Sequence, residues 1–139
     1  MRRILILDQD KLYVRSITSQ LIKNGYSVDV AFNAQSAIAK IDKVEPDLIL
    51  CEVLLTGHNG LEFMHELRSY PEWQGIPLIV LSRIDKLDIQ ITKKNMMDYG
   101  IIDVWYKPEV SMQSLLEKIE RTLTNNSKTG RINNEDKVR

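Results

Sequence analysis

Polar and charged side chains follow four of the apolar runs in this chain, and they are the first candidates for chemistry. They are Asp8, Gln9 and Asp10 after residues 4–7, Glu52 after 47–51, Ser82 after 76–81, and Lys107 after 103–106. A carboxylate such as Glu52, placed where an apolar strand opens toward solvent, is a reacting group, a metal ligand, a charge partner or a chance occurrence. The function of the chain depends on which of these roles it has.

The elements that must position these residues can be predicted from hydrophobic periodicity. Apolar runs alternate with amphipathic stretches, which predicts strands over 4–7, 26–31, 47–51, 76–81 and 103–106, and helices over 11–25, 34–44, 60–70, 87–100 and 111–123. Strands separated by helices imply an α/β fold with an open parallel sheet and helices on both faces. Ligands of such sheets bind beyond the carboxyl ends of the strands. The polar side chains are therefore expected to meet at one edge.

Each candidate also has a purely structural explanation. Asp10 can cap the first helix, Ser82 can satisfy a turn, and Lys107 can be a solvated surface side chain. Any one of these explanations is as good as a functional one. It is harder to explain on structural grounds why four separate strands place polar groups at the same edge. Together these residues therefore favour a functional site.

Four segments of the sequence resemble the receiver domain of bacterial two-component response regulators, the CheY-like family. They are "LILDQDK", "PDLILCEVLLTGHNGLEF", "IPLIVLS" and "VWYKP", and the similarity extends from Arg3 to about Leu123. The resemblance implies a flavodoxin-like sheet of order 2-1-3-4-5. It also implies that a histidine kinase transfers a phosphoryl group to an aspartate after the third strand, beside a magnesium ion held by acids after the first. A Ser or Thr and a Lys then bind the phosphoryl oxygens.

The chain matches this pattern at some positions and departs from it at others. The matching residues are Asp8, Ser82, Lys107, Gly60 and Pro108. Glu52 stands at the phosphoacceptor position instead of aspartate, and Gln9 stands at the second acidic position after the first strand. Val104 occupies the position where many receivers carry a switching Tyr or Phe. The sequence is thus similar to an atypical receiver, or pseudo-receiver.

The two departures affect the expected chemistry. Glutamate moves the nucleophilic oxygen outward by ~1.5 Å, and a misplacement of about 1 Å can slow a positioned reaction on the order of 10²-fold. The neutral amide of Gln9 is a poorer magnesium ligand than a carboxylate. We therefore expect a degenerate metal site at Asp8 and Gln9 that stays empty, and no cofactor.

These departures favour a non-enzymatic interaction module of two-component signalling that works independently of phosphorylation. In it Glu52 either pairs with Lys107 to imitate part of the phosphorylated state or balances its charge passively. One alternative is a working phosphoacceptor receiver that uses Mg²⁺ and a histidine kinase partner. Another is a flavodoxin-like enzyme that binds a nucleotide or flavin, although the acidic turn "DQDK" suits phosphate poorly.

The expected partners are signalling proteins, namely a histidine kinase or a downstream effector. The resemblance implies that they bind the face built by the predicted helix 87–100, the strand 103–106 and the helix 111–123. A weak homodimer is a further expectation. Nineteen basic and nineteen acidic residues cancel, which argues against nucleic acid or a membrane surface as a partner.

Other features bound the location and the extent of the domain. Cys51 is the single cysteine and is most simply a core residue, which suits a reducing compartment. The first apolar run has only four residues, too few for a signal peptide or a membrane span. We therefore predict a cytoplasmic protein. The receiver-like domain is predicted over 1–124, followed by a polar tail over 125–139 that is disordered or a linker.

Overall fold

The computed structural model describes the backbone of residues 1–57, 59–85 and 90–138, and side chains up to residue 125. Its strands are β1 (Arg3–Leu7), β2 (Ser27–Ala31), β3 (Leu48–Cys51), β4 (Leu78–Ser82) and β5 (Ile101–Tyr106). Its helices are α1 (Lys11–Lys23), α2 (Ala34–Lys43), α3 (Gly60–Ser69), α4 (Lys93–Asp98) and α5 (Met112–Val138). Two short 3₁₀ helices, η1 (Pro71–Trp73) and η2 (Lys107–Glu109), follow α3 and β5.

The strands form one parallel sheet of order β2-β1-β3-β4-β5, as the sequence predicted. Ile6 of β1, for example, pairs with Val30 on one side and with Leu50 on the other. Because all strands run in the same direction, their carboxyl ends meet at one edge of the sheet. The candidate polar residues follow these ends.

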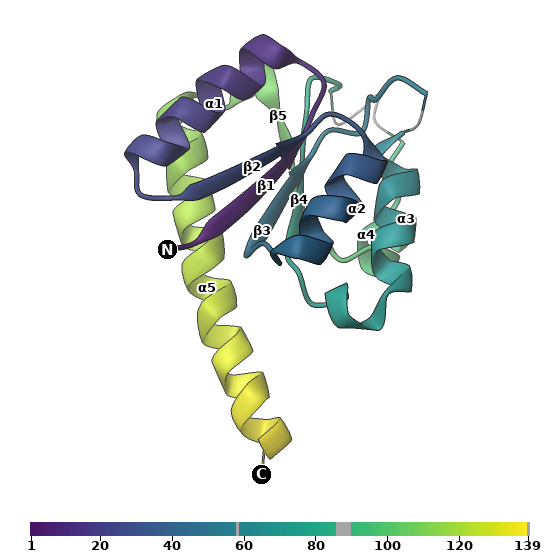
Figure 1. Cartoon of the computed structure of the whole chain (residues 1–139), viewed down its shortest axis with the longest axis vertical. Helices are drawn as coiled ribbons and strands as arrows, with labels where there is room; N and C mark the ends of the chain where they lie inside the picture. Colours follow the sequence, from purple (N-terminus) through teal and green to yellow (C-terminus); the bar gives the residue numbers. More distant parts are fainter. Residues whose placement is uncertain (58, 86–89, 139) are drawn as a thin grey trace.

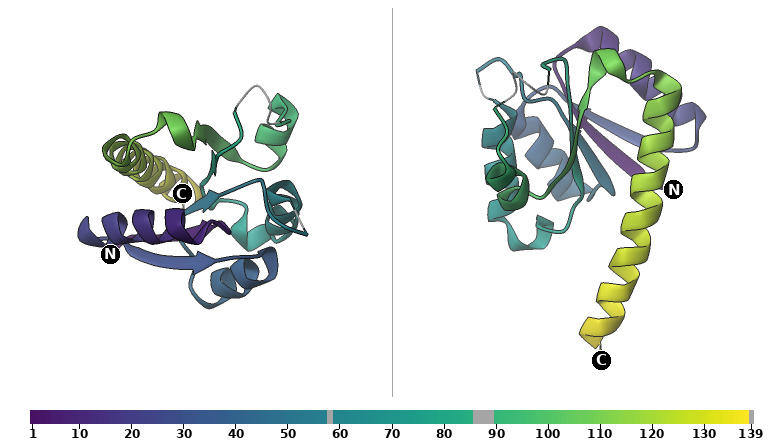
Figure 2. Two further views of the ribbon diagram at one scale, coloured as in Figure 1. Left: turned by 90° about the horizontal axis from the view of Figure 1, so that it is seen from above. Right: turned by 180° about the vertical axis from the view of Figure 1, so that it is seen from behind.

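The sheet lies between two layers of helices (Figures 1 and 2), because both of its faces are apolar. Side chains of a strand point alternately to opposite faces. Ile4 and Ile6 accordingly pack with α1 and α5, whereas Leu5 and Leu7 pack with α2 and α3. The predicted covering of both faces by helices is confirmed.

The bounds of α4 and β5 differ from those predicted. The helix expected over 87–100 is α4, which covers only Lys93–Asp98, and residues 86–89 lie outside the described part of the chain. Thr92 starts α4 through a reciprocal capping box with Asn95, and Gly100, with a φ of +60°, follows its end. Strand β5 begins at Ile101, two residues earlier than expected, across a register irregularity opposite Leu78 and Ile79.

The last helix is longer than predicted. It was expected to end at residue 123, but the backbone of α5 continues to Val138 and projects beyond the sheet (Figure 1). The segment contains no proline, and elongation adds one hydrogen bond for each residue that is fixed. The expectation that the tail over 125–139 is disordered or a linker stays a prediction. The division into a domain over 1–124 and a tail stays a prediction.

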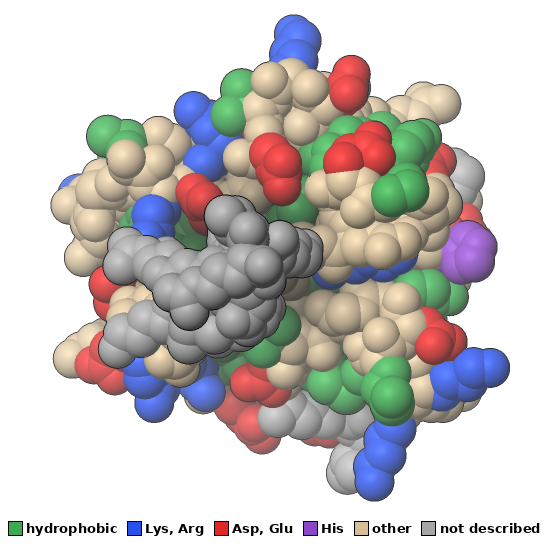
Figure 3. Space-filling view, turned by 90° about the horizontal axis from the view of Figure 1, so that it is seen from below, with side chains coloured by type: hydrophobic (Ala, Val, Ile, Leu, Met, Phe, Trp, Pro, Cys, Tyr) green, Lys and Arg blue, Asp and Glu red, His purple; other side chains and the backbone are tan. Residues whose placement is uncertain are grey.

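The surface at the end toward which α5 projects carries acidic and basic side chains side by side (Figure 3). This mixture agrees with the zero formal net charge of the chain. Within the described residues, no helix has the length and apolar character that crossing a membrane requires.

Candidate functional site

Asp10 forms the amino-terminal cap of α1. Its Oδ1 accepts a hydrogen bond of 3.1 Å from the Tyr13 N–H. A cap of this type satisfies one of the free N–H groups in the first turn of a helix. The structural interpretation of Asp10 is thus confirmed.

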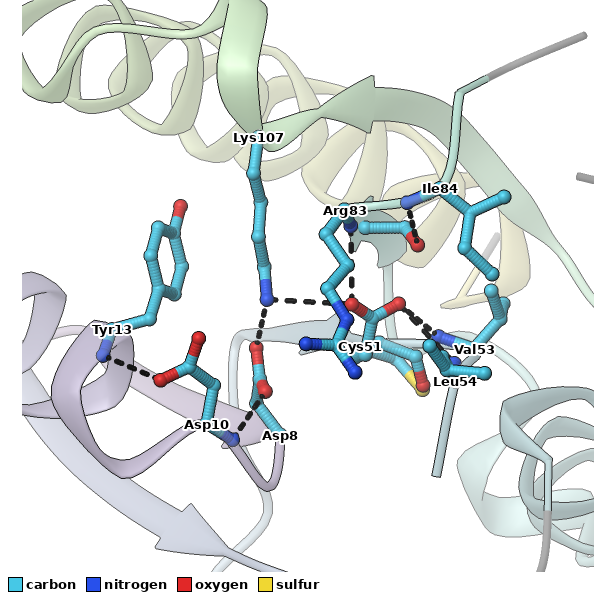
Figure 4. Close-up of polar contacts among 11 residues, drawn as sticks. Asp8, Asp10, Tyr13, Cys51, Val53, Leu54, Arg83, Ile84 and Lys107 are labelled. Carbon is cyan, nitrogen blue, oxygen red and sulfur yellow. Dashed lines mark hydrogen bonds and ion pairs between the residues drawn. The ribbon is translucent and has the colours of Figure 1, made fainter. Parts of the chain in front are cut away.

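Asp8 and Lys107 form a close ion pair at the carboxyl edge of the sheet (Figure 4). The Lys107 Nζ lies 2.6 Å from Oδ2 of Asp8, and the side chains are only 8% and 5% exposed. Oδ1 of Asp8 accepts a second bond, of 2.9 Å, from the Asp10 N–H. Both carboxylate oxygens of Asp8 therefore already have protein donors.

The Glu52 carboxylate accepts hydrogen bonds from four groups. Its Oε2 accepts from the Val53 N–H at 2.8 Å and the Leu54 N–H at 3.2 Å. Its Oε1 accepts from the Arg83 N–H at 3.1 Å and lies 3.4 Å from the Lys107 Nζ. Only 3% of the Glu52 side chain is exposed. Three backbone donors and an ammonium thus converge on one buried carboxylate.

The sheet and one glycine explain this convergence. Strands β3 and β4 are parallel neighbours with Cys51 opposite Val80, so Glu52 follows β3 close to the end of β4, and its side chain reaches the Arg83 N–H. The chain after Glu52 turns tightly into α3, where the Gly60 N–H donates to the Val53 carbonyl at 2.9 Å. A Cβ at Gly60 would come within 2.5 Å of the Glu52 carbonyl oxygen. Only glycine permits this close approach.

Gln9 does not point its amide at Asp8 or Glu52 as a shared metal ligand would. Its Nε2 donates to the Phe32 carbonyl at 3.1 Å, and its Oε1 accepts from the Thr56 N–H at 2.7 Å. The amide therefore joins the loop after β1 to the loops after β2 and β3.

Ser82 and Val104 occupy different environments. The Ser82 hydroxyl is fully buried and accepts a hydrogen bond of 3.1 Å from the Ile84 N–H. Val104 lies half-buried on β5 and packs against the core shared with α2 and α3. The phosphate-pocket role of Ser82 and the switch role of Val104 stay predictions.

Tyr13 and Arg83 belong to the site but were not predicted from the sequence. The Tyr13 ring lies over Lys107, with Nζ 4.3 Å from the ring centroid. Burial, together with the charges of Asp8, Glu52 and Asp10, raises the pKa of Tyr13 to about 12. Arg83 directly follows Ser82 and could have been found by extending the strand-end rule by one residue. Tyr13 carries no such signal, because it sits in the first turn of a helix.

A cavity of about 600 Å³ opens at this edge. Among the described residues, its walls contain three acidic side chains, Asp8, Asp10 and Glu52, and two basic ones, Lys107 and Arg83, so this part of the lining is acidic on balance. Within the described part of the chain, no three His, Cys, Asp or Glu residues gather closely enough to hold a metal ion. Magnesium prefers a near-octahedral shell of oxygens. The carboxylate oxygens of Asp8 and Glu52 already accept hydrogen bonds from N–H groups and from Lys107. They therefore do not fit such a site.

Among the described residues, three further side chains that could carry chemistry or contact a partner have structural surroundings. Cys51 is fully buried, which raises the pKa of its thiol, and the expectation of a core residue is confirmed. His65 is exposed and packs edge-on against Tyr99. Trp105 is only 4% exposed and packs in the core.

Comparison with known proteins agrees with this geometry. A sequence model of the response regulator receiver domain matches residues 4–120. The chain belongs to this family. Receiver domains of this family act in two-component signalling, and the predicted family resemblance is thereby confirmed.

Solved receiver structures share the fold. A CheY-like receiver domain protein from Methanospirillum hungatei JF-1 is 26% identical, with a TM-score of 0.79 over 93% of this chain and 98% of that one. A two-component response regulator from Clostridium difficile is 28% identical, with a TM-score of 0.77 over 89% and 97%. The Thermotoga maritima response regulator TrrA, solved with Mg²⁺ and BeF, is 22% identical, with a TM-score of 0.71 over 87% and 98%. The last likeness concerns the fold alone.

Proposed function

We propose that this receiver is a protein-interaction module that works without phosphorylation and is not an enzyme. The observation that carries the proposal is the position of the Glu52 carboxylate. It accepts hydrogen bonds from the N–H groups of Val53, Leu54 and Arg83 and lies 3.4 Å from the Lys107 ammonium. Donors that converge in this way form an anion site. Glu52 fills that site from within the chain.

The length of the side chain supports this proposal. An aspartate at position 52 would be shorter by one methylene, ~1.5 Å, and would leave these donors to an external anion such as a phosphoryl group. Glutamate reaches them itself and is held with only 3% of its side chain exposed. A carboxylate has one charge on two oxygens, whereas a phosphoryl group has about −1.5 to −2 on three. Glu52 therefore supplies part of the charge that phosphorylation would bring.

The experiment that tests the proposal is incubation with acetyl phosphate and magnesium, read by intact-mass spectrometry, with beryllofluoride binding as a second measurement. We expect no phosphoryl group on the wild-type chain. The double variant Glu52→Asp with Gln9→Asp is expected to accept one, because Asp8, Ser82 and Lys107 remain to neutralise its charge. The same double variant with Lys107→Ala is the negative control. A phosphorylated wild-type chain would favour the alternative of a working receiver.

In this proposal the protein acts in the cytoplasm. Its partners bind the face built by α4, β5 and α5. Met97 on α4 and Ile102 on β5 are 82% and 48% exposed and supply apolar contact area for a histidine kinase or an effector. The variant Glu52→Gln separates active mimicry from a passive charge balance. Amide shifts that extend from the cavity to β5 and α5 support mimicry, whereas shifts confined to the residues around Glu52 support the passive pair.

The alternative of a nucleotide- or flavin-binding enzyme is disfavoured by the charge of the cavity. A bound phosphate needs N–H and hydroxyl donors free to reach it. Here Asp8, Asp10 and Glu52 line the walls, and three of the backbone donors are already bonded to Glu52.

A further inference from the structure

The side chain of Gln9 connects three loops at the carboxyl edge of the sheet. Gln9 lies between β1 and α1, Phe32 between β2 and α2, and Thr56 between β3 and α3. The amide donates to the Phe32 carbonyl at 3.1 Å and accepts from the Thr56 N–H at 2.7 Å. These two contacts require one donor and one acceptor on the same planar group. Glutamine supplies both, and an ionised carboxylate supplies only the acceptor.

Thr56 belongs to the segment that also holds the Glu52 carboxylate. We call residues 53–57 the donor loop, because the N–H groups of Val53 and Leu54 in this loop donate to Glu52. The Val53 carbonyl at the start of the loop is fixed by the Gly60 N–H. Gln9 fixes the same loop further along, at Thr56. The path of the donor loop is therefore held at both points.

We propose that Gln9 is a positioning residue that holds the donor loop against Glu52 and makes this arrangement independent of divalent cations. The inference rests on the proposed function, since it concerns how the filled anion site is kept in place. A carboxylate at position 9 would face the Phe32 carbonyl oxygen, and two acceptors without a proton between them repel each other. A cation would then be needed to offset that repulsion. The neutral amide removes the need.

Amide hydrogen exchange of the donor loop, with and without millimolar magnesium, tests this proposal. The variants are Gln9→Leu, which loses both contacts, and Gln9→Glu, which keeps the acceptor and adds a charge. The control Gln35→Glu makes the same charge change on the exposed side of α2. Exchange of the β4 amides reports whether a variant has kept its fold.

We expect the wild-type and Gln35→Glu chains to exchange the Val53, Leu54 and Thr56 amides at the same rate with and without magnesium. In Gln9→Leu all three amides are expected to exchange about tenfold faster, the effect of losing about one hydrogen bond, and magnesium should not reverse this. In Gln9→Glu they are expected to exchange faster without magnesium and to slow again when it is added.

Three results would overturn the proposal. Wild-type exchange rates in Gln9→Leu would mean that Gln9 positions nothing, and acceleration at Thr56 alone would mean that it does not act on the groups that hold Glu52. Protection of the wild-type donor loop by magnesium would contradict independence from cations. None of these readouts involves phosphoryl transfer, so a phosphorylated wild-type chain would defeat the proposed function while leaving the exchange results to be judged separately.

Discussion

The Lys107 ammonium lies closer to Asp8 than to Glu52, at 2.6 Å against 3.4 Å. The sequence directed attention to Glu52 as its partner, but the stronger pair is with Asp8. Lys107 therefore links the two carboxylates, with its charge shared unequally between them. Two buried acids and one buried base leave the group with an excess negative charge, which three backbone N–H groups at Glu52 help to stabilise.

We predict that Lys107→Met lowers the free energy of unfolding by about 3 kcal/mol, because it leaves two buried carboxylates without their base. Asp8→Asn should lower it by less, because Lys107 keeps Glu52 as a partner at 3.4 Å. The double variant should lose clearly less than the sum of the two, since both halves of the pair are then gone. Urea unfolding of the wild-type chain, the two single variants and the double variant gives the double-mutant cycle. Additive losses would mean that the ion pair contributes nothing to stability.

Tyr13 should make stability depend on pH in the alkaline range. Its pKa is raised from 10.0 to about 12 in the folded chain. Between these values the unfolded chain releases the phenolic proton and the folded chain retains it, so stability must fall as the pH rises from 10 to 12. Tyr13→Phe should show a smaller fall over this range. The pKa of Tyr26 is raised in the same direction, but it is present in both chains and cancels in the comparison.

Gly60→Ala should destabilise the chain by about 1–3 kcal/mol, the usual cost of overpacking. The added Cβ would come within 2.5 Å of the Glu52 carbonyl oxygen and 2.8 Å of the Val53 Cα. Both are backbone atoms, which cannot move without displacing the chain around them. Gly75→Ala is the matched control, because a Cβ there meets nothing within 4 Å. Equal urea midpoints for the two variants would contradict the prediction.

Arg68 should hold α3 to the turn between α4 and β5. Its guanidinium donates to the carbonyls of Tyr99, Trp73 and Ile76 at 2.7–2.8 Å, and desolvation lowers the pKa of this arginine. Arg68→Met leaves these carbonyls without their donor, at a cost of about 2 kcal/mol.

Hydrogen exchange should also become faster at Gly100 in this variant. Arg15→Met, on the exposed face of α1, is the control and should change neither stability nor exchange. Unaltered exchange at Gly100 in Arg68→Met would mean that the turn is held by other contacts.

The sheet could be predicted because its strands are short apolar runs. Residues 4–7 and 78–81 are buried on both faces, so they carry almost no polar side chain and stand out in the sequence. The rule that ligand sites follow strand ends then located Asp8, Glu52 and Lys107 at one edge. Helix ends were less predictable, because α4 begins at a capping box and α5 continues through a segment with Gly130 and four asparagines, residues of low helix propensity.

The partners of the site residues could not be predicted in the same way. Whether Lys107 bonds to Asp8 or to Glu52 depends on differences of less than 1 Å, which follow from side-chain rotamers and not from spacing. Gln9 appeared in the sequence only as a missing acid. Its two hydrogen bonds involve Phe32 and Thr56, residues far from it along the chain whose backbone groups carry no sequence signal.

Most of the groups that donate hydrogen bonds to Glu52 are backbone N–H groups. This limits what mutagenesis of the site can detect. Every amino acid except proline carries the same N–H group, so exchange of Val53, Leu54 or Arg83 for alanine leaves all three donors in place. A mutational scan would therefore register side chains such as Asp8, Glu52 and Lys107 but not these three donors. For the same reason, relatives can differ in side chain at these positions, within the packing that buried Val53 requires, and still hold a carboxylate in the same way. Replacing the amides of these three residues by esters would remove the N–H groups and so measure what they contribute.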